Sequence, residues 1–322
     1  MKRIGITIGD PAGIGPELVV KISEAFKDEN AYIIYGEEKT LKEAQRLLGV
    51  SLSFKTINTP EEVKDPGVYV ADLNITEKPV PQPSITSGKV AVAYLARATV
   101  DAVRGSIDGI LTMPINKFWA RRAGFSFEGQ TEYLAQATST REYAMMMWSE
   151  KVRVVLLSTH IPLKEAVIKV RREEVRSKIE LILREYTRLF KREPSVGVLG
   201  LNPHAGEFGD IGREDVEEIM PVVEEFKKKG HRVEGPLPPD SAFLKPDEFD
   251  VFLCMYHDQG LIPFKILAFK EGVNLTLGIP FPRTSPDHGT AYDIAWKGLA
   301  DPGSSVKALE LLESLIENLK GG

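Results

Sequence analysis

The chain has 322 residues, of which 43% are hydrophobic and 27% charged, a composition typical of globular proteins and long enough for two hydrophobic cores. Its net charge of −5, without a long Lys/Arg run, argues against a nucleic-acid-binding protein. A single cysteine, Cys254, excludes an internal disulfide and a cysteine-based zinc site, and no apolar stretch has the length of a leader or membrane span, so we expect a cytoplasmic protein.

Short apolar runs and amphipathic segments alternate along the chain. The segments with helical periodicity predict helices over 89–105, 173–192, 213–230 and 306–320. Alternation of strands and helices predicts an α/β fold with a largely parallel sheet in each of two domains. The apolar runs that predict strands are 3–9, 31–36, 67–73, 107–115, 152–159, 195–201, 249–256 and 274–279.

The loop GDPAGIGPE (9–17) follows the first predicted strand and precedes a helix that begins near Pro16. Glu17 would then lie near the positive end of that helix. The loop is similar to a dinucleotide-binding fingerprint, but Leu18 stands where the third glycine is needed. By itself it predicts a tight strand-to-helix turn that lines a cleft.

Three of the five histidines, His160, His204 and His257, come just after an apolar run. Ligands of open α/β sheets bind beside the carboxyl ends of the strands. Imidazoles from separate strands can converge there on one divalent cation, with coordination positions left open for a substrate. Each could instead be a hydrogen-bonded structural histidine, and spacing alone leaves both interpretations open.

Two polar segments follow the third histidine, HDQGLIPFK (257–265) and NLTLGIPFPRTSPDHGTAYD (274–293). Lys and Arg near a metal suit a phosphorylated or carboxylated substrate, and Arg283 could bind it through two nitrogens. We expect a helix to begin at Gly289 and Thr290, where its amino end could hold an anion.

Seven motifs in order, GDPAGIGPE, TMPINK, GQTEYLA, STHIPL, GLNPHAGEFG, YHDQGLIPFK and NLTLGIPFPRTSPDHGTAYDIA, resemble the 4-hydroxythreonine-4-phosphate dehydrogenases of pyridoxal phosphate biosynthesis. The resemblance covers nearly the whole chain. It implies a two-domain α/β/α fold similar to isocitrate and isopropylmalate dehydrogenases, with an NAD site that is not of the Rossmann type. It also implies one discontinuous domain (1–128 with 285–322) and a second (129–284) with the metal ligands and dimer interface.

The resemblance also assigns roles to residues of a homodimer whose active site lies at the interface. A divalent metal (zinc, magnesium or cobalt) would be held by His160, His204 and His257 of the partner subunit. Candidates for the general base are Asp240, Asp258 and Lys265. Substrate contacts are expected from Gln130, Thr131, Lys265, Asn274 and Arg283. NAD or NADP contacts are expected from Asn274, Thr284, Ser285, Asp287, His288 and Gly289.

The implied reaction is oxidation of 4-phosphohydroxy-L-threonine to 2-amino-3-oxo-4-phosphooxybutanoate, which decarboxylates to 3-amino-2-oxopropyl phosphate. The chain departs from the family at one position, where Gln130 replaces the usual histidine of G-H-T-E. Gln130 can donate a hydrogen bond to a phosphate oxygen but cannot become cationic.

Three other functions stay open on the sequence. One is dehydrogenation of a related four-carbon sugar-acid phosphate, such as threonate or erythronate 4-phosphate. Another is acyl or phosphoryl transfer, because phosphotransacetylases share this general fold. The third is metal or phosphate binding without catalysis.

Overall fold

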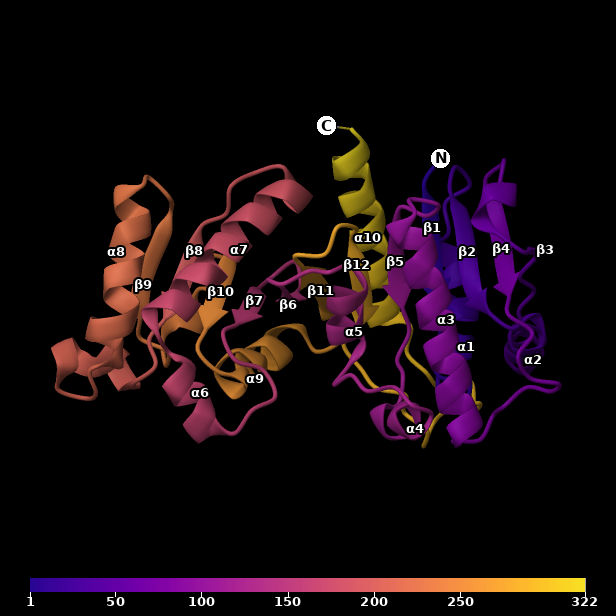
Figure 1. Ribbon diagram of the computed structural model, residues 1–322, viewed down its shortest axis with the longest axis horizontal. Helices are drawn as coiled ribbons and strands as arrows, with labels where there is room; N and C mark the ends of the chain where they lie inside the picture. Colours follow the sequence, from indigo (N-terminus) through magenta and orange to yellow (C-terminus); the bar gives the residue numbers. More distant parts are fainter. Residues whose placement is uncertain (322) are drawn as a thin grey trace. The chain divides into compact units, whose positions relative to one another are not determined.

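The computed structural model describes residues 1–321, which form two compact units (Figure 1). Unit 1 comprises Met1–Arg141 and the segment from Ile279 onward, and unit 2 comprises Glu142–Gly278. The units therefore divide near residues 141 and 278, whereas the resemblance suggested 128 and 284. Helices and strands alternate in both units, which confirms the predicted α/β class.

Unit 1 contains a parallel sheet in the strand order β3-β4-β2-β1-β5-β12. Its central strand, β1, is apolar and buried from its second residue onward, as expected for a strand covered on both faces. The strands are β1 (Arg3–Thr7), β2 (Ala31–Gly36), β3 (Lys55–Ile57), β4 (Gly67–Asp72), β5 (Gly109–Thr112) and β12 (Arg283–Pro286).

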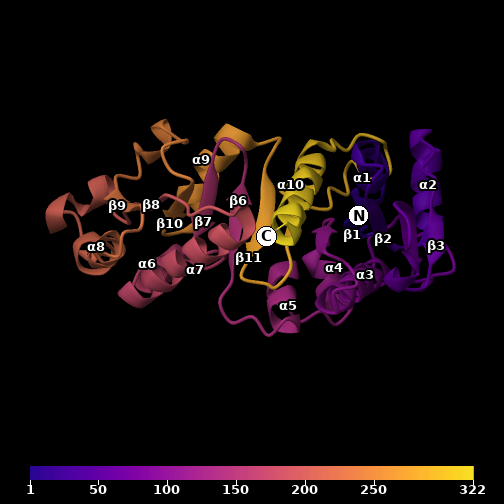
Figure 2. The ribbon, with the colours of Figure 1, turned by 90° about the horizontal axis from the view of Figure 1, so that it is seen from above.

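Helices cover both faces of this sheet. Figure 2 shows α1 and α10 on one side of the strands and α3 and α4 on the other. The helices are α1 (Gly15–Ile22), α2 (Glu38–Leu48), α3 (Ile85–Val103), α4 (Lys117–Arg122), α5 (Gln130–Ala137) and α10 (Gly303–Lys320), with short 3₁₀ turns η1 (Ser23–Ala25) and η2 (Pro60–Glu62).

Unit 2 has a mixed sheet in the order β11-β6-β7-β10-β8-β9. Strand β6 pairs antiparallel with both neighbours, and the strands from β7 to β9 are parallel. The strands are β6 (Ala144–Trp148), β7 (Arg153–Leu156), β8 (Val196–Leu199), β9 (Val233–Leu237), β10 (Val251–Cys254) and β11 (Val273–Leu277).

In unit 2, α7 and α9 lie on opposite sides of the strands (Figure 2). The helices are α6 (Leu163–Lys169), α7 (Arg172–Phe190), α8 (Met220–Lys228) and α9 (His257–Ala268). Shorter turns are η3 (Pro203–Gly209), η4 (Asp215–Ile219) and η5 (Ala242–Leu244). Within residues 1–321, no helix of either unit has the length and apolar character that a membrane span requires.

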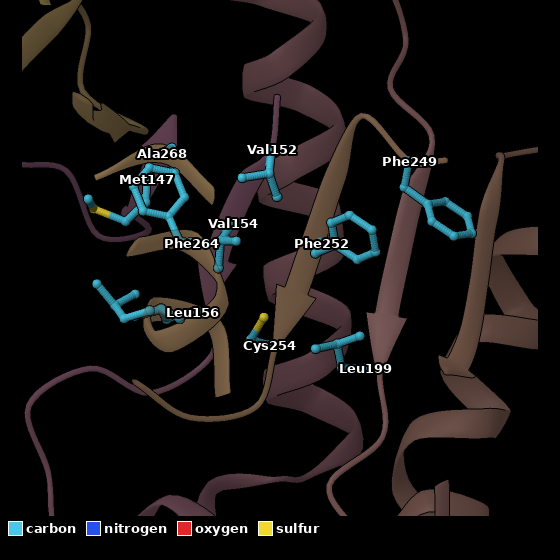
Figure 3. Packing of buried hydrophobic residues seen from close by; sticks show 11 residues of the cluster. Met147, Val152, Val154, Leu156, Leu199, Phe249, Phe252, Cys254, Phe264 and Ala268 are labelled. Carbon is cyan, nitrogen blue, oxygen red and sulfur yellow. The ribbon is translucent and has the colours of Figure 1, made fainter. Parts of the chain in front are cut away.

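The core of unit 2 forms around the middle strands of its sheet. Figure 3 shows Val154 of β7, Phe252 and Cys254 of β10 and Phe264 of α9 packed together. Cys254 is fully buried, and this burial raises the pKa of its thiol well above the usual range, so the residue acts as a small apolar side chain. The core fixes the strand ends from which the polar loops begin.

Four strands and one helix differ from the sequence-based expectation. Strands β3, β6, β9 and β12 were not predicted, because three of them are short or polar and AMMMW in β6 lacks a β-branched pattern. The helix expected at Gly289 is wrong. The chain instead forms turns, with Ala291 and Trp296 in the left-handed region at φ 43° and 59°.

Candidate functional site

His204 lies on a left-handed turn that follows β8. The residues from His204 to Phe208 all have positive φ, between 42° and 78°, and four of these five are not glycine. Each such residue costs roughly 1–2 kcal/mol relative to a right-handed conformation. Backbone strain of this kind concentrates at functional sites, so the turn supports a functional role for His204.

Asp215 of η4 anchors the strained turn. Its carboxylate is fully buried and accepts hydrogen bonds from the backbone N–H of Leu201 at 2.7 Å and of Asn202 at 3.1 Å, and from Asn202 Nδ2 at 2.8 Å. A side chain at Gly200 would collide with the same carboxylate. The backbone that leads into His204 is therefore fixed by contacts to a residue 11 positions further along the chain.

The His204 ring is oriented by Glu207, whose Oε1 lies 2.6 Å from Nδ1. The hydrogen bond and charge of Glu207, followed by the charge of Asp240, raise the pKa of His204. With Nδ1 committed to a carboxylate, Nε2 is the nitrogen left to face a ligand.

His160 and His257 lie together, with ring centroids 5.5 Å apart. His257 is the first residue of α9, and its Nδ1 is 2.7 Å from Asp258 Oδ1, so it has the same carboxylate-oriented geometry as His204. The rings of His160 and His257 are therefore close neighbours within one chain.

The full predicted histidine set is not assembled within one chain. Among residues 1–321, no three His, Cys, Asp or Glu side chains are grouped closely enough to hold a metal ion. The structure thus brings together His160 and His257 and gives His204 a separate environment beside Glu207 and Asp240.

Two of the three candidate bases line one hollow of about 390 Å³ in unit 2. Asp240 follows β9, and Asp258 belongs to the first turn of α9. Tyr256 and Gln259 contribute further polar groups to the same hollow. The third candidate, Lys265, is an exposed residue two turns along α9 from His257.

Arg283 is a buried cation at the edge of unit 1's sheet, with 3% of its surface exposed. Its Nε and Nη2 donate to Thr112 Oγ1 at 2.9 and 2.6 Å, and its Nη1 donates to Thr131 Oγ1 at 3.3 Å. Burial lowers the pKa of Arg283 to about 10, against the opposing effect of Glu132, so the guanidinium stays protonated at neutral pH. A desolvated guanidinium beside the amino end of α5 suits an anionic ligand.

Gln130 opens α5 next to Thr131. Its Nε2 donates to the Met113 carbonyl at 3.1 Å, and its Oε1 is buried with no hydrogen-bond partner among residues 1–321. Asn274 of β11 is similar: Nδ2 contacts Met145 Sδ at 2.8 Å, and Oδ1 is buried and unpartnered in the described chain. Each carboxamide thus has an acceptor oxygen that a bound ligand could satisfy.

The expected cofactor residues of unit 1 have different environments. Thr284 is fully buried, and its hydroxyl donates to the Ala308 carbonyl at 2.8 Å, so this hydroxyl stabilises the packing of β12 on α10. The Asp287 backbone N–H donates to Ser304 Oγ at 2.9 Å, and Ser285 is buried.

His288 has a buried Nε2 with no hydrogen-bond partner in residues 1–321, and Gly289 next to it is exposed. Burial lowers the pKa of His288, so its imidazole is neutral at pH 7. Its Nδ1 lies 3.3 Å from the Gly289 carbonyl, which leaves Nε2 as an acceptor. Residues 287–289 are therefore the part of the expected cofactor surface that is open to a ligand.

Several residues that shape the site were missed in the sequence. Thr112 holds Arg283, Asp215 anchors the His204 turn, and Glu207 orients His204. The one signal available was the position of Glu207 three residues after His204. The other two act across long sequence separations and carry no local pattern.

Comparison with known proteins identifies the family. The family model described as pyridoxal phosphate biosynthetic protein PdxA matches residues 28–312. A 4-hydroxythreonine-4-phosphate dehydrogenase of Aquifex aeolicus is 64% identical over 318 residues, which cover 99% of each chain. A D-threonate 4-phosphate dehydrogenase of Pectobacterium atrosepticum is 39% identical, covering 98% of this chain and 99% of its own.

A solved structure has the same fold. The crystal structure of 4-hydroxythreonine-4-phosphate dehydrogenase from Klebsiella pneumoniae matches with a TM-score of 0.84 and 36% identity, covering 98% of this chain and all of its own. The family model covers most of the chain, and the sequence similarity to the relatives extends over nearly its full length. The chain therefore belongs to the pyridoxal phosphate biosynthetic protein PdxA family.

Proposed function

We propose that the chain is an NAD-dependent, divalent-metal-dependent 4-hydroxythreonine-4-phosphate dehydrogenase. The substrate would be 4-phosphohydroxy-L-threonine, oxidised at its 3-hydroxyl to 2-amino-3-oxo-4-phosphooxybutanoate. Loss of carbon dioxide from this β-keto acid would give 3-amino-2-oxopropyl phosphate. The observation that carries the proposal is the buried Arg283 guanidinium beside Thr131, in a chain 64% identical to a relative of that name.

Different residues of the chain would bind the phosphate, contact other substrate groups and accept the proton. Arg283, Thr131 and Lys265 would bind the phosphate, because a desolvated guanidinium forms strong charge-assisted hydrogen bonds. Asn274 would accept a hydrogen bond from a substrate group through an oxygen that is unpartnered within residues 1–321, and Gln130 would donate a hydrogen bond to the phosphate. Asp240, Asp258 or Lys265 would take the proton of the 3-hydroxyl.

His160, His204 and His257 are the residues that would hold a zinc, magnesium or cobalt ion. When bound, the cation would supply a Lewis acid and NAD or NADP a hydride acceptor. The carboxylates beside His204 and His257 would keep Nε2 of each ring directed outward.

We also propose a homodimer, in which His257 of the partner subunit would complete a metal set. Helix α9 and the residue that follows it carry a row of exposed apolar side chains, with Ile262 59%, Ile266 78% and Phe269 72% exposed. The first two are one helical turn apart and the third continues the same face. Exposed apolar rows of this kind mark interaction surfaces, and a twofold dimer would cover the row on both copies.

One experiment tests the activity and the metal together. Formation of NADH is followed with 4-phosphohydroxy-L-threonine, D-threonate 4-phosphate and D-erythronate 4-phosphate, using enzyme stripped of metal and then restored with zinc, magnesium or cobalt. We expect activity with the first substrate and only after metal is restored. His204→Ala should lose both activity and bound metal by elemental analysis, whereas His231→Ala, a change of the same kind at a surface turn, should keep both.

Two outcomes would contradict the proposal. Turnover of D-threonate 4-phosphate alone would assign the chain the activity named for the Pectobacterium atrosepticum relative. Full metal content and activity in His204→Ala would remove His204 from the metal site.

A further inference from the structure

The segment 290–300 has no regular secondary structure, yet its backbone is held in one conformation. It runs beside α1 in Figure 2. Two of its residues, Ala291 and Trp296, occupy the left-handed region at φ 43° and 59°. Neither is glycine, so contacts from elsewhere in unit 1 must stabilise this conformation. We call this segment the clasped loop.

Glu17 of α1 provides the central contact. Its side chain is fully buried, and its two carboxylate oxygens accept the backbone N–H of Trp296 and of Gly298, the latter at 2.8 Å. Hydrogen bonds to a buried carboxylate are about twice as strong as neutral ones. Glu17 thus satisfies two backbone donors that a helix would otherwise have used.

The rest of the glycine loop and α1 hold the remainder of the clasped loop. Lys21 Nζ donates to the carbonyls of Gly298 and Ala300 at 2.9 and 2.6 Å. Trp296 Nε1 donates to the Pro11 carbonyl at 3.0 Å. The Tyr292 hydroxyl donates to Asp10 Oδ2 at 2.6 Å. The segment GDPAGIGPE (9–17) therefore binds a loop that lies 281 residues further along the chain at the contact between Glu17 and Gly298.

The clasped loop begins directly after the open part of the expected cofactor surface. The Ile14 N–H donates to the Thr290 carbonyl at 3.0 Å. A side chain at Gly13 would lie 2.8 Å from the same carbonyl oxygen, so the glycine permits this approach. Thr290 is the residue after Gly289, and the buried acceptor Nε2 of His288 is two residues before it. Movement of the clasped loop would therefore displace both.

We propose that Glu17 is a positioning residue for the cofactor: by holding the backbone of the clasped loop it fixes residues 287–290 in the conformation that binds NAD. This inference rests on the proposed NAD-dependent function. Loss of Glu17 would lower the fraction of molecules in which residues 287–290 have the conformation that binds NAD. The apparent dissociation constant of NAD equals the intrinsic constant divided by that fraction, so it would rise.

The test compares Glu17→Gln with a matched control. Gln keeps the shape of Glu17 but offers one acceptor oxygen to two backbone donors. The control is Glu313→Gln, which changes another buried carboxylate of unit 1, one that binds Lys27 and Tyr32 instead of the clasped loop. Both variants lose one buried negative charge, so general destabilisation affects both.

Three quantities are measured on the full-length protein. Hydrogen exchange of at least one of the Trp296 and Gly298 amides should be about tenfold faster in Glu17→Gln, the change expected for loss of one hydrogen bond to a charged group. The dissociation constant of NAD, from calorimetric titration, should rise about tenfold if a tenth of the molecules keep the binding conformation. KM for the phosphorylated substrate should stay within about twofold, because the hydrogen bonds from Arg283 to Thr112 and Thr131 hold the guanidinium from outside the loop.

Each outcome has a distinct meaning. Equal amide exchange in Glu17→Gln and Glu313→Gln would overturn the role of Glu17 in holding the loop. Faster exchange with unchanged NAD affinity would overturn its positioning role while leaving the proposed activity standing. A parent protein that turns over its substrate without binding NAD would contradict the proposed cofactor, and the positioning role with it.

Discussion

Replacing Thr112 with valine removes the hydroxyl that accepts two hydrogen bonds from Arg283, at 2.9 and 2.6 Å. Valine has nearly the same shape, so the change leaves no large cavity. Hydrogen bonds to charged groups contribute about 1.5–3 kcal/mol each, and the Arg283 contact with Thr131 remains. We therefore expect the free energy of unfolding to fall by about 3–6 kcal/mol, a large part of the roughly 5–15 kcal/mol typical of a domain.

Thr284→Val is the matched control for this prediction. Thr284 is also fully buried and lies on the strand that pairs with β5, but its hydroxyl donates to a neutral carbonyl, that of Ala308. Its loss should cost about 1 kcal/mol. Equilibrium unfolding in urea, followed by circular dichroism and by tryptophan fluorescence, gives both values. If Thr112→Val costs no more than Thr284→Val, the hydroxyl does not stabilise the buried cation and the reasoning fails.

Two further predictions concern pH. Burial alone would raise the pKa of Asp250, but hydrogen bonds from Arg192 and Ser195 hold it at about 2. Because this folded-state pKa is below the ordinary value, the stabilisation is present above about pH 4 and is lost as the pH falls toward 2. Asp250→Asn should thus unfold more easily than the parent at pH 6 but not at pH 2 in urea titrations, and an equal deficit at both would contradict this. Gln130→His should keep activity and lower KM for the phosphorylated substrate below about pH 6.5, where imidazole becomes cationic. Identical KM profiles from about pH 5.5 to 8 would mean that position 130 does not contact the phosphate.

The positions of the histidines could be predicted from the sequence because strands covered on both faces leave continuous apolar runs. Strands β7, β8 and β10 end at Leu156, Leu199 and Cys254, each within a few residues of a histidine. The pairing of His160 with His257 follows from the adjacency of β7 and β10, which sequence order does not reveal. The local apolar pattern thus predicts where each strand ends but not which strands are adjacent in the sheet.

The helix expected after Gly289 illustrates why other parts could not be predicted. GTAYDIA has residues that a helix accepts, and its local pattern carries no sign of Glu17 or Lys21. These two side chains bind the backbone groups that helical hydrogen bonds would have used. Tertiary contacts therefore override local preference, a competition that short-range patterns cannot register.

The left-handed turn at His204 is a second example. Ala205, Glu207 and Phe208 all prefer right-handed conformations, and only Gly206 is suited to positive φ. The turn forms because the buried Asp215 carboxylate fixes the preceding residues. A sequence-based prediction would need to know that contact before it could predict the turn.

The discontinuity of unit 1 has a consequence for synthesis on the ribosome. Unit 2 is a continuous segment, so all of its strands are available once Gly278 has emerged. Unit 1 must wait for β12 and α10, because β12 completes the sheet beside β5 and the Thr284 hydroxyl joins it to α10. Until then the outer edge of β5 has no neighbour within its own unit and can pair with other chains. We therefore expect that, in ribosome-bound chains from which Gly278 has just emerged, unit 2 is protected from proteolysis while unit 1 remains open to cleavage.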